Sequence, residues 1–210
     1  MEKKEKTRET ILSKAREIFL KKGLFDVIMD DIAEEAGLTR RTLYRYFATK
    51  EDLAFETTIG LIDEWNSYQK EVASGLQGSG LDRLETFLGK LIEYMSDRLD
   101  VMRYLGEFDF YFKGEKESVA SEEERERFEG VILESDDLLR EMLERGIGDK
   151  SIRDQIDIPL TIATISNVLW SFAQRVAARD SRIIRETGYR GVELIAHQVS
   201  LYIDALKENR

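Results

Sequence analysis

Apolar side chains recur at intervals of three and four residues along most of the chain, which is the spacing of amphipathic helices. A first helix is predicted over residues 7–22. Gly23 follows as its stop, because glycine adopts a positive φ at little cost. We expect Leu24 and Phe25 to enter the core that this helix helps to form. The apolar positions of the helix are Ile11, Ala15, Ile18 and Phe19.

The same spacing predicts helices through the rest of the chain, with residues 74–80 as the clearest loop. Asp157 and Pro159 open one of these helices, because the missing N–H of proline is harmless in a first turn. Few stretches alternate between apolar and polar residues as strands do, so the predicted fold class is all-α. The other expected helical ranges are about 50–72, 81–96, 101–113, 115–148 and 189–207.

Between residues 29 and 47 the pattern is a short helix, a tight turn and a second helix. Asp30 and Asp31 occupy the first turn of the leading helix, where the helix dipole favours negative charge. Gly37 supplies the turn, and Thr39 is a suitable N-cap for the second helix. This pattern is typical of a helix-turn-helix motif, and an ordinary helical hairpin in a bundle has the same spacing. The positions expected to face inward are Ile32, Ala33, Ala36, Leu43, Tyr46 and Phe47.

Charge is distributed unevenly along the chain. The formal net charge is −10, but residues 1–50 carry 12 Lys and Arg against 9 Asp and Glu. Residues 38–50 contain four basic side chains and no acidic one. A basic window on an acidic body favours a local contact with nucleic acid, because the rest of the chain repels other polyanions.

The sequence has no cysteine, which excludes disulfides, thiolate metal sites and a cysteine nucleophile and fits a reducing cytoplasm. The charged N-terminus is unlike an export signal. The most apolar stretch, residues 158–173, is interrupted by polar side chains and is too short to span a bilayer. We therefore expect a cytoplasmic protein with no membrane partner.

No constellation typical of an enzyme is present. The patterns G-x-G-x-x-G, P-loop and G-x-S-x-G do not occur. His197 is the single histidine, so no second histidine or cysteine joins it in a catalytic or metal site. The carboxylates of residues 122–124 are typical of a solvated helix start. We predict that the chain is not an enzyme and holds no metal or cofactor.

The segment from Gly23 to Leu53 resembles the N-terminal domain of the TetR family of transcriptional regulators. The hallmark of that domain is a tyrosine and a phenylalanine three residues apart with a lysine three residues further on, present here as Tyr44, Phe47 and Lys50. The sequence departs from the family at Ile28, where a threonine commonly caps the next helix and touches phosphate. We expect that contact to be missing.

The resemblance implies a three-helix, helix-turn-helix DNA-binding domain over residues 1–50 and a helical effector-binding and dimerisation domain over residues 51–210. It also implies that Tyr44 and Lys50 contact phosphate. In the major groove, the outward side chains of the second motif helix would reach base edges and phosphates. The alternative is that its arginines are solvated surface and Tyr44 is a packing residue. The predicted DNA-binding residues are Thr39, Arg40, Arg41, Thr42, Tyr44, Arg45, Tyr46 and Lys50.

Apolar residues cover two faces of the helix after Asp157 and two faces of the last helix, which predicts burial on both sides. The resemblance implies that these helices build a four-helix bundle with a second copy of the chain. Two core helices of a monomer would show the same stripes. His197, beside Leu194 and Leu201, is expected to flank the interface. The predicted interface residues are Ile162, Ile165, Leu169, Phe172, Val192, Ile195, Val199 and Ile203.

Aromatic and soft apolar side chains are frequent in the middle helices and are suited to lining a pocket for a flat or fatty small molecule. The same residue types commonly form ordinary core. The predicted pocket residues are Trp65, Phe87, Leu91, Tyr94, Met95, Met102, Phe108, Tyr111, Phe112, Phe128, Asn167 and Trp170.

These patterns together predict a ligand-responsive repressor that binds a palindromic operator in double-stranded DNA as a homodimer and is released by an unidentified small-molecule effector. Activation is the alternative sign of regulation. A helical scaffold that keeps the helix-turn-helix for packing alone is the alternative function, and specific binding to a palindrome separates the two.

Overall fold

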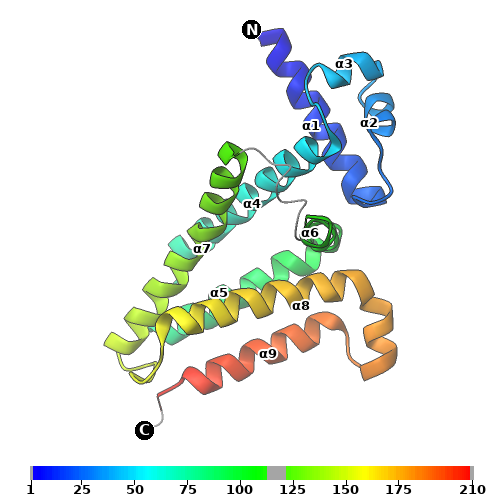
Figure 1. Cartoon of the computed structure of the whole chain (residues 1–210). Coiled ribbons are helices and arrows are strands. Elements are labelled where there is room, and N and C mark those ends of the chain that lie inside the picture. The colour runs from blue at the N-terminus through cyan, green and yellow to red at the C-terminus, as the bar shows by residue number, and fades with distance from the viewer. Residues whose placement is uncertain (1, 113–121, 209–210) are drawn as a thin grey trace. The chain divides into compact units, whose positions relative to one another are not determined.

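The computed structural model describes residues 2–112 and 122–208, apart from the side chains of residues 2, 122–129 and 131–135. Within these ranges the regular structure is helical and the only β-type contact is an isolated bridge between Ile152 and Lys207, which confirms the all-α prediction (Figure 1). None of the described helices is long and apolar enough to cross a membrane. The helices are α1 (Glu2–Lys22), α2 (Met29–Glu35), α3 (Arg40–Tyr44), α4 (Lys50–Gly75), α5 (Gly80–Asp97), α6 (Leu99–Tyr111), α7 (Glu122–Gly148), α8 (Ile158–Thr187) and α9 (Gly191–Leu206).

The helix ends follow the predicted boundaries with one larger difference. α1 begins at Glu2, whereas the apolar spacing predicted a start at residue 7. The additional residues include Lys3, Lys4 and Lys6, and lysine and glutamate are good helix formers even without an apolar face. The first residues of the helix predicted over 115–148 lie outside the described residues.

The chain divides into two compact units, one of Met1–Asp63 with Arg103–Val131 and one of Glu64–Met102 with Ile132–Arg210. The first unit therefore joins the N-terminal helices to the part of α6 that starts at Arg103. The functional boundary predicted after residue 50 stays a prediction.

The helix-turn-helix in the first unit has the local features that the sequence predicts. Gly37 has a φ of 66°, which glycine adopts readily and other residues rarely do. The turn is closed by the N–H of Leu38, which donates to the carbonyl oxygen of Ala33 at 2.8 Å. Thr39 caps α3, because its hydroxyl accepts from the N–H of Thr42 at 3.2 Å. The fully buried side chains of this unit include Ile11, Ala15, Phe19, Leu24, Ile32 and Leu43.

Phe25 contradicts the expectation that it enters the core, because its side chain is 49% exposed while Leu24 is fully buried. The two residues follow each other in the turn after α1, so only one of them faces inward. The ring of Phe25 lies on the surface beside the rings of Phe110 and Tyr111, at centroid distances of 6.0 and 5.4 Å.

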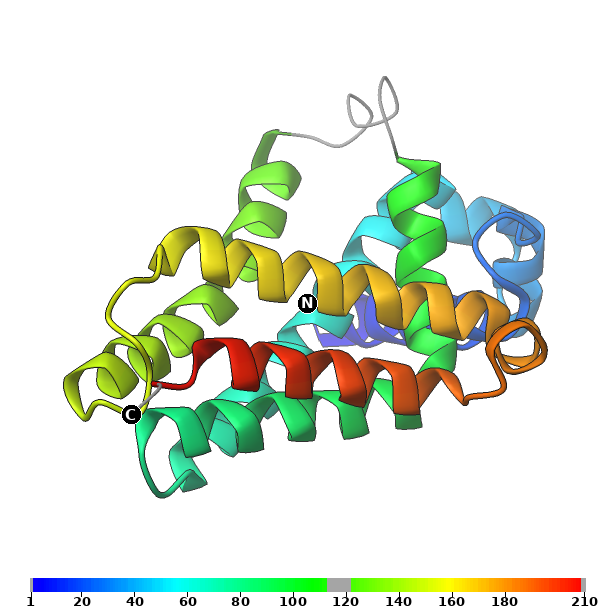
Figure 2. The ribbon, with the colours of Figure 1, turned by 90° about the horizontal axis from the view of Figure 1, so that it is seen from below.

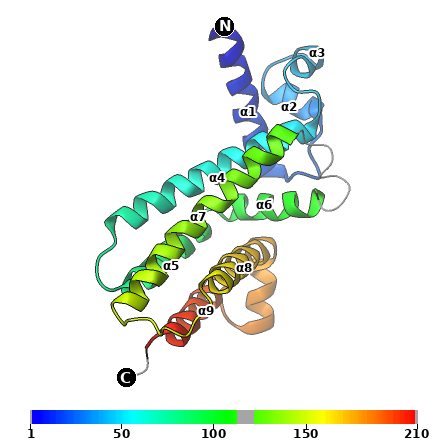
Figure 3. The ribbon, with the colours of Figure 1, turned by 60° about the vertical axis from the view of Figure 1, so that its left-hand side comes forward.

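In the second unit, α9 packs along both α5 and α8, and the three helices run side by side (Figures 2 and 3). The start of α5 is held by the turn after α7. The N–H of Gly80 donates to Oδ2 of Asp149 at 2.7 Å, and the N–H of Leu81 donates to Oγ of Ser151 at 3.0 Å. These hydrogen bonds satisfy N–H groups that have no partner within the helix itself.

The predicted dimer interface needs correction, because six of its eight residues are buried within the single chain. Each of these helices has two apolar faces. The sequence pattern alone did not show which face of α8 packs against α9, or which face of α9 packs against α5 and α8. The other two predicted interface residues, Phe172 and Val192, are half-buried. The six core residues are Ile162, Ile165, Leu169, Ile195, Val199 and Ile203.

Candidate nucleic-acid interface

The outer face of α3 is the best candidate for contact with nucleic acid. Leu43 is fully buried and anchors the helix, so the side chains on the opposite face are exposed. That face contains an open surface hollow lined by Arg41, Thr42, Tyr44 and Arg45. Two guanidinium groups, a hydroxyl and a phenol suit phosphate oxygens and base edges.

Arg40 has a different environment from the other two arginines. Its Nε and Nη1 atoms face the carboxylate of Asp30 on α2, with Nε 3.2 Å from Oδ1 and Nη1 3.2 Å from Oδ2. Its guanidinium also lies 5.5 Å from the ring centroid of Tyr44. This geometry fixes the direction of the Arg40 side chain and leaves Arg41 and Arg45 on the central part of the exposed face.

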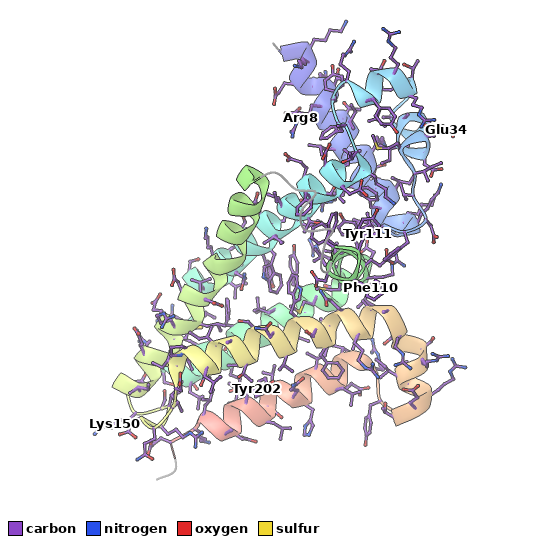
Figure 4. All side chains as sticks on the ribbon, in the orientation of Figure 1. Arg8, Glu34, Phe110, Tyr111, Lys150 and Tyr202 are labelled. Atoms are coloured by element: carbon purple, nitrogen blue, oxygen red, sulfur yellow. The ribbon has the colours of Figure 1, made fainter. Side chains whose placement is uncertain are left out.

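The segment just after α3 rests against α1. The guanidinium of Arg8 lies 5.2 Å from the ring centroid of Phe47 and pairs with Oε1 of Glu56 at 2.9 Å (Figure 4). Hydrogen bonding with Thr7, followed by hydrogen bonding with Arg45, holds the pKa of Tyr46 below its ordinary value. Tyr46 is half-buried in these contacts. The inward position predicted for it is therefore met only in part, and its contact with DNA stays a prediction.

Lys50, implied by the family resemblance to contact phosphate, begins α4 and makes a contact inside the first unit. Its Nζ donates to the carbonyl oxygen of Leu24 at 2.9 Å and lies 5.2 Å from the ring centroid of Tyr111. The lysine therefore ties the start of α4 to the turn after α1. Its contact with phosphate stays a prediction.

Residues of α6 at intervals of four contact the end of α1, the turn after it and the start of α4. The carboxylate of Glu107 accepts from the N–H of Leu24 at 2.6 Å, and the guanidinium of Arg103 donates to the carbonyl oxygen of Leu20. The hydroxyl of Tyr111 donates to Oε1 of Glu51 at 2.6 Å. Burial, followed by that hydrogen bond, raises the pKa of Tyr111 to about 12. Sequence reasoning missed Arg103 and Glu107, because nothing local marks their partners.

Ile28 is the N-cap of α2 and is 60% exposed, with no side-chain hydrogen bond to the helix. The side chain of Asp31, in the first turn of α2, binds back to this N-cap residue: its Oδ2 accepts from the N–H of Ile28 at 2.9 Å. This hydrogen bond, and then Lys22, hold the pKa of Asp31 below its ordinary value. The helix start thus has one carboxylate cap but no threonine hydroxyl facing outward.

The predicted pocket residues fall into both units. In the second unit, the ring of Trp65 lies edge-to-face against Tyr94 and Trp170, with centroid distances of 5.3 and 5.7 Å. Asn167 is exposed, and its amide donates to the carbonyl oxygen of Ala163 at 2.8 Å; its place in a pocket stays a prediction. The remaining predicted residues of this unit, all buried, are Phe87, Leu91, Met95 and Met102.

The first unit holds the other predicted pocket residues. Phe108 and Phe112 are buried and pack around Phe55, with ring centroids 5.1 and 4.5 Å from it. Tyr111 is half-buried and engaged with Glu51. The side chain of Phe128 lies outside the described part of the structure.

Sequence reasoning missed two buried amides beside the Trp65 cluster. Asn66 and Gln69 on α4 are only 4% and 2% exposed, and Nε2 of Gln69 donates to Oδ1 of Asn66 at 3.3 Å. Nearby, Tyr68 packs against Tyr94 with ring centroids 4.4 Å apart. The signal in the sequence was two amides next to an aromatic residue on a long helix, which is also a common surface pattern.

Residues 11–57 match the family described as bacterial regulatory proteins, tetR family. A relative similar over nearly the whole chain is the HTH-type transcriptional repressor KstR2 of Rhodococcus jostii (strain RHA1). It is 29% identical over 205 residues, covering 95% of this chain and 90% of that protein. The family match spans α2 and α3, so it includes the exposed face described above.

Solved structures share the fold of the chain. The ketosteroid transcriptional regulator KstR2 of Mycobacterium tuberculosis aligns with a TM-score of 0.66 and 19% identity, over 96% of this chain and 95% of that one. The regulator FadR from Bacillus subtilis, solved in complex with stearoyl-CoA, aligns with a TM-score of 0.70 and 17% identity, over 94% of this chain and 98% of that one.

Proposed function

We propose that this chain, a transcriptional regulator of the TetR family, represses transcription by binding a palindromic operator as a homodimer and leaves the DNA when a small molecule binds. The observation that carries the proposal is the hollow lined by Arg41, Thr42, Tyr44 and Arg45, which lies within the residues that match the family. In this proposal residues 1–50 bind DNA, and residues 51–210 bind the effector and the second copy. Repression is favoured over activation because the relative KstR2 is a repressor.

Within this proposal, Arg41 and Arg45 make the base contacts, and Arg40 acts on DNA through phosphate. Arg41 and Arg45 lie opposite the buried Leu43, so they project furthest from the unit. Arg40 is held toward α2 by Asp30. An arginine that forms two hydrogen bonds to guanine contributes about 1–3 kcal/mol of discrimination against other bases.

The test compares Arg41→Lys with Arg40→Lys on the same operator. Lysine keeps the charge but loses the planar pair of donors, so Arg41→Lys should relax the preference at one base pair in each half-site by about 1–3 kcal/mol. Arg40→Lys should leave base preference unchanged. Equal loss of preference in both variants would contradict the assignment, and the absence of any base preference in the wild type would contradict DNA recognition itself.

For the effector, we propose a largely apolar molecule with a polar group, of the fatty acyl or steroid class. The rings of Trp65, Tyr94 and Trp170 offer apolar walls, and Asn66 and Gln69 place two buried amides on the same helix as Trp65. An apolar site with few polar groups is typical of small-molecule pockets. Related support comes from FadR, whose structure contains stearoyl-CoA, and from KstR2, a ketosteroid regulator.

Intrinsic fluorescence tests the effector site directly, because the only two tryptophans of the chain are Trp65 and Trp170. The protein is titrated with stearoyl-CoA and separately with a ketosteroid. One of these two ligands should give a saturable change in tryptophan emission and should release operator DNA at the same concentration. Coenzyme A without an acyl chain is the control. Unchanged emission with both probes would contradict the proposed ligand class.

We propose that the second copy packs on the exposed faces of α8 and α9, because six of the predicted interface residues are buried in the core of the single chain. Leu160, Val168 and Leu201 remain 64%, 37% and 54% exposed on these helices. Exposed apolar side chains on otherwise core-forming helices favour a partner surface. Leu201→Glu should give a monomeric mass by light scattering at micromolar concentration, while Thr10→Glu, an exposed control in the first unit, should leave a dimer. A monomeric wild type would contradict the dimer.

A further inference from the structure

The first turns of α1 form a lysine-bearing extension of the DNA-binding unit. α1 begins at Glu2, whereas the family match begins at residue 11. Figures 1 and 3 both show this end of α1 and α3 at the same end of the first unit. The extension therefore lies on the same end of the unit as the proposed reading helix and outside the residues that carry the family resemblance.

Two contacts fix which side of α1 faces α3. The guanidinium of Arg8 stacks on the ring of Phe47. Arg8 lies one turn before the fully buried Ile11, on the same face of α1. Thr7, the neighbour of Arg8 in the chain, lies close enough to Tyr46 to hold the pKa of its phenol below the ordinary value. Both partners lie in the segment just after α3, so residues 7 and 8 mark the face of α1 that is directed toward that segment.

Lys3 and Lys4 continue that face beyond the core. Residues four apart on a helix are neighbours on the same face, so Lys3 lies one turn before Thr7 and Lys4 one turn before Arg8. Thr7 confirms this spacing, because its hydroxyl donates to the carbonyl oxygen of Lys3 at 2.9 Å. One helical turn rises about 5.4 Å, which carries the two lysines past the end of the packed unit.

Both lysine side chains are exposed. Among the described side chains, neither ammonium group has a carboxylate within ion-pair distance, in contrast to Lys14, which pairs with Glu17 at 2.7 Å. The helical spacing places the nearby Glu5 on a different face of α1. The side of α1 toward α3 is therefore positively charged.

We propose that Lys3 and Lys4 form a second DNA-contacting site, which binds backbone phosphates that flank the base pairs under α3. An ammonium group on a flexible stem binds phosphate as a point charge and adds affinity without sequence preference. This inference rests on the proposed function, because it requires α3 to lie on operator DNA.

The test measures operator affinity against salt concentration for the full chain and for the double variant Lys3→Gln/Lys4→Gln. Each phosphate contact contributes about 0.9 to the slope of log K against log salt, so the slope should become shallower by about 1.8 per bound protomer. The selected operator sequence should stay the same. The matched control is Lys21→Gln/Lys150→Gln, which removes the same amount of charge from two exposed lysines outside the first turns of α1.

A control with the wild-type slope and a double variant with the shallower slope supports the site. Equal slopes in the wild type and the double variant, or an equal change in the control, overturns it. Failure of the wild type to select any operator is a separate result, which overturns the proposed function itself. Circular dichroism of each variant checks that α1 stays folded.

Discussion

Replacing Gly23 by alanine should destabilise the first unit more than the same replacement at Gly37. Both glycines have positive φ angles, 89° and 66°, so alanine at either position costs about 1–2 kcal/mol in backbone conformation. A methyl group at Gly23 would lie 2.7 Å from Oε2 of Glu107, whereas nothing lies within 4 Å of one at Gly37. Only the first replacement therefore displaces a neighbouring side chain.

The displaced group is the carboxylate that accepts from the N–H of Leu24 at 2.6 Å. A hydrogen bond to a charged group contributes about 1.5–3 kcal/mol to stability. Gly23→Ala should therefore lower the free energy of unfolding by about 1.5–3 kcal/mol more than Gly37→Ala. The entropy that alanine removes from the unfolded chain is common to both variants and cancels in the difference.

Urea unfolding followed by circular dichroism measures the two single variants, together with Glu107→Ala and Gly23→Ala/Glu107→Ala. Without the carboxylate there is nothing left to displace, so Gly23→Ala should then cost only the backbone contribution. Equal costs for the two glycine replacements would refute this reasoning. So would an undiminished cost of Gly23→Ala in the absence of the Glu107 carboxylate.

Three further predictions concern single groups in the same unit. Thr39→Ala removes the side-chain cap of α3 and should lower stability by about 1 kcal/mol in urea unfolding; no change would contradict the cap. The pKa of Asp31 is lowered by the N–H of Ile28, so its contribution is present above the unfolded pKa of about 3.9 and lost as pH falls through the folded pKa. Asp31→Asn should therefore lose less stability on acidification than the wild type, and identical acid profiles would contradict this. Tyr111 should ionise at about 12 in an ultraviolet titration, and Glu51→Gln should lower that pKa. The stability that the neutral phenol contributes is present below its unfolded pKa of about 10 and is lost as the pH rises toward 12. Ionisation of Tyr111 near 10 would contradict this prediction.

Local sequence signals predicted the helices well where a residue acts on its own neighbours. Gly37 closes the turn of the motif and Thr39 caps α3, as their residue types indicate. Pro159 lies in the first turn of α8, where its ring is harmless. These effects span only a few residues, so the sequence contains all the information that they need.

Contacts between distant segments could not be predicted in this way. Leu24 and Glu107 are 83 residues apart, and neither is an unusual residue for its helix or turn. The pairing of Arg40 with Asp30 depends on how α2 and α3 cross, so the sequence left the two arginines of α3 and the arginine at its C-cap equivalent. On α8 the sequence has apolar residues on two faces, and it could not show which face is buried. In the structure Ile162 belongs to the core and Leu160 is exposed.

Sequence-specific DNA binding is the central claim, and selection of genomic fragments by the purified protein tests it most directly. Salt is held at about 150 mM, because phosphate contacts make affinity fall steeply with ionic strength. The wild type should enrich one palindromic sequence, and Arg41→Ala/Arg45→Ala should enrich none. No enrichment by the wild type, or equal enrichment by both proteins, would contradict the account.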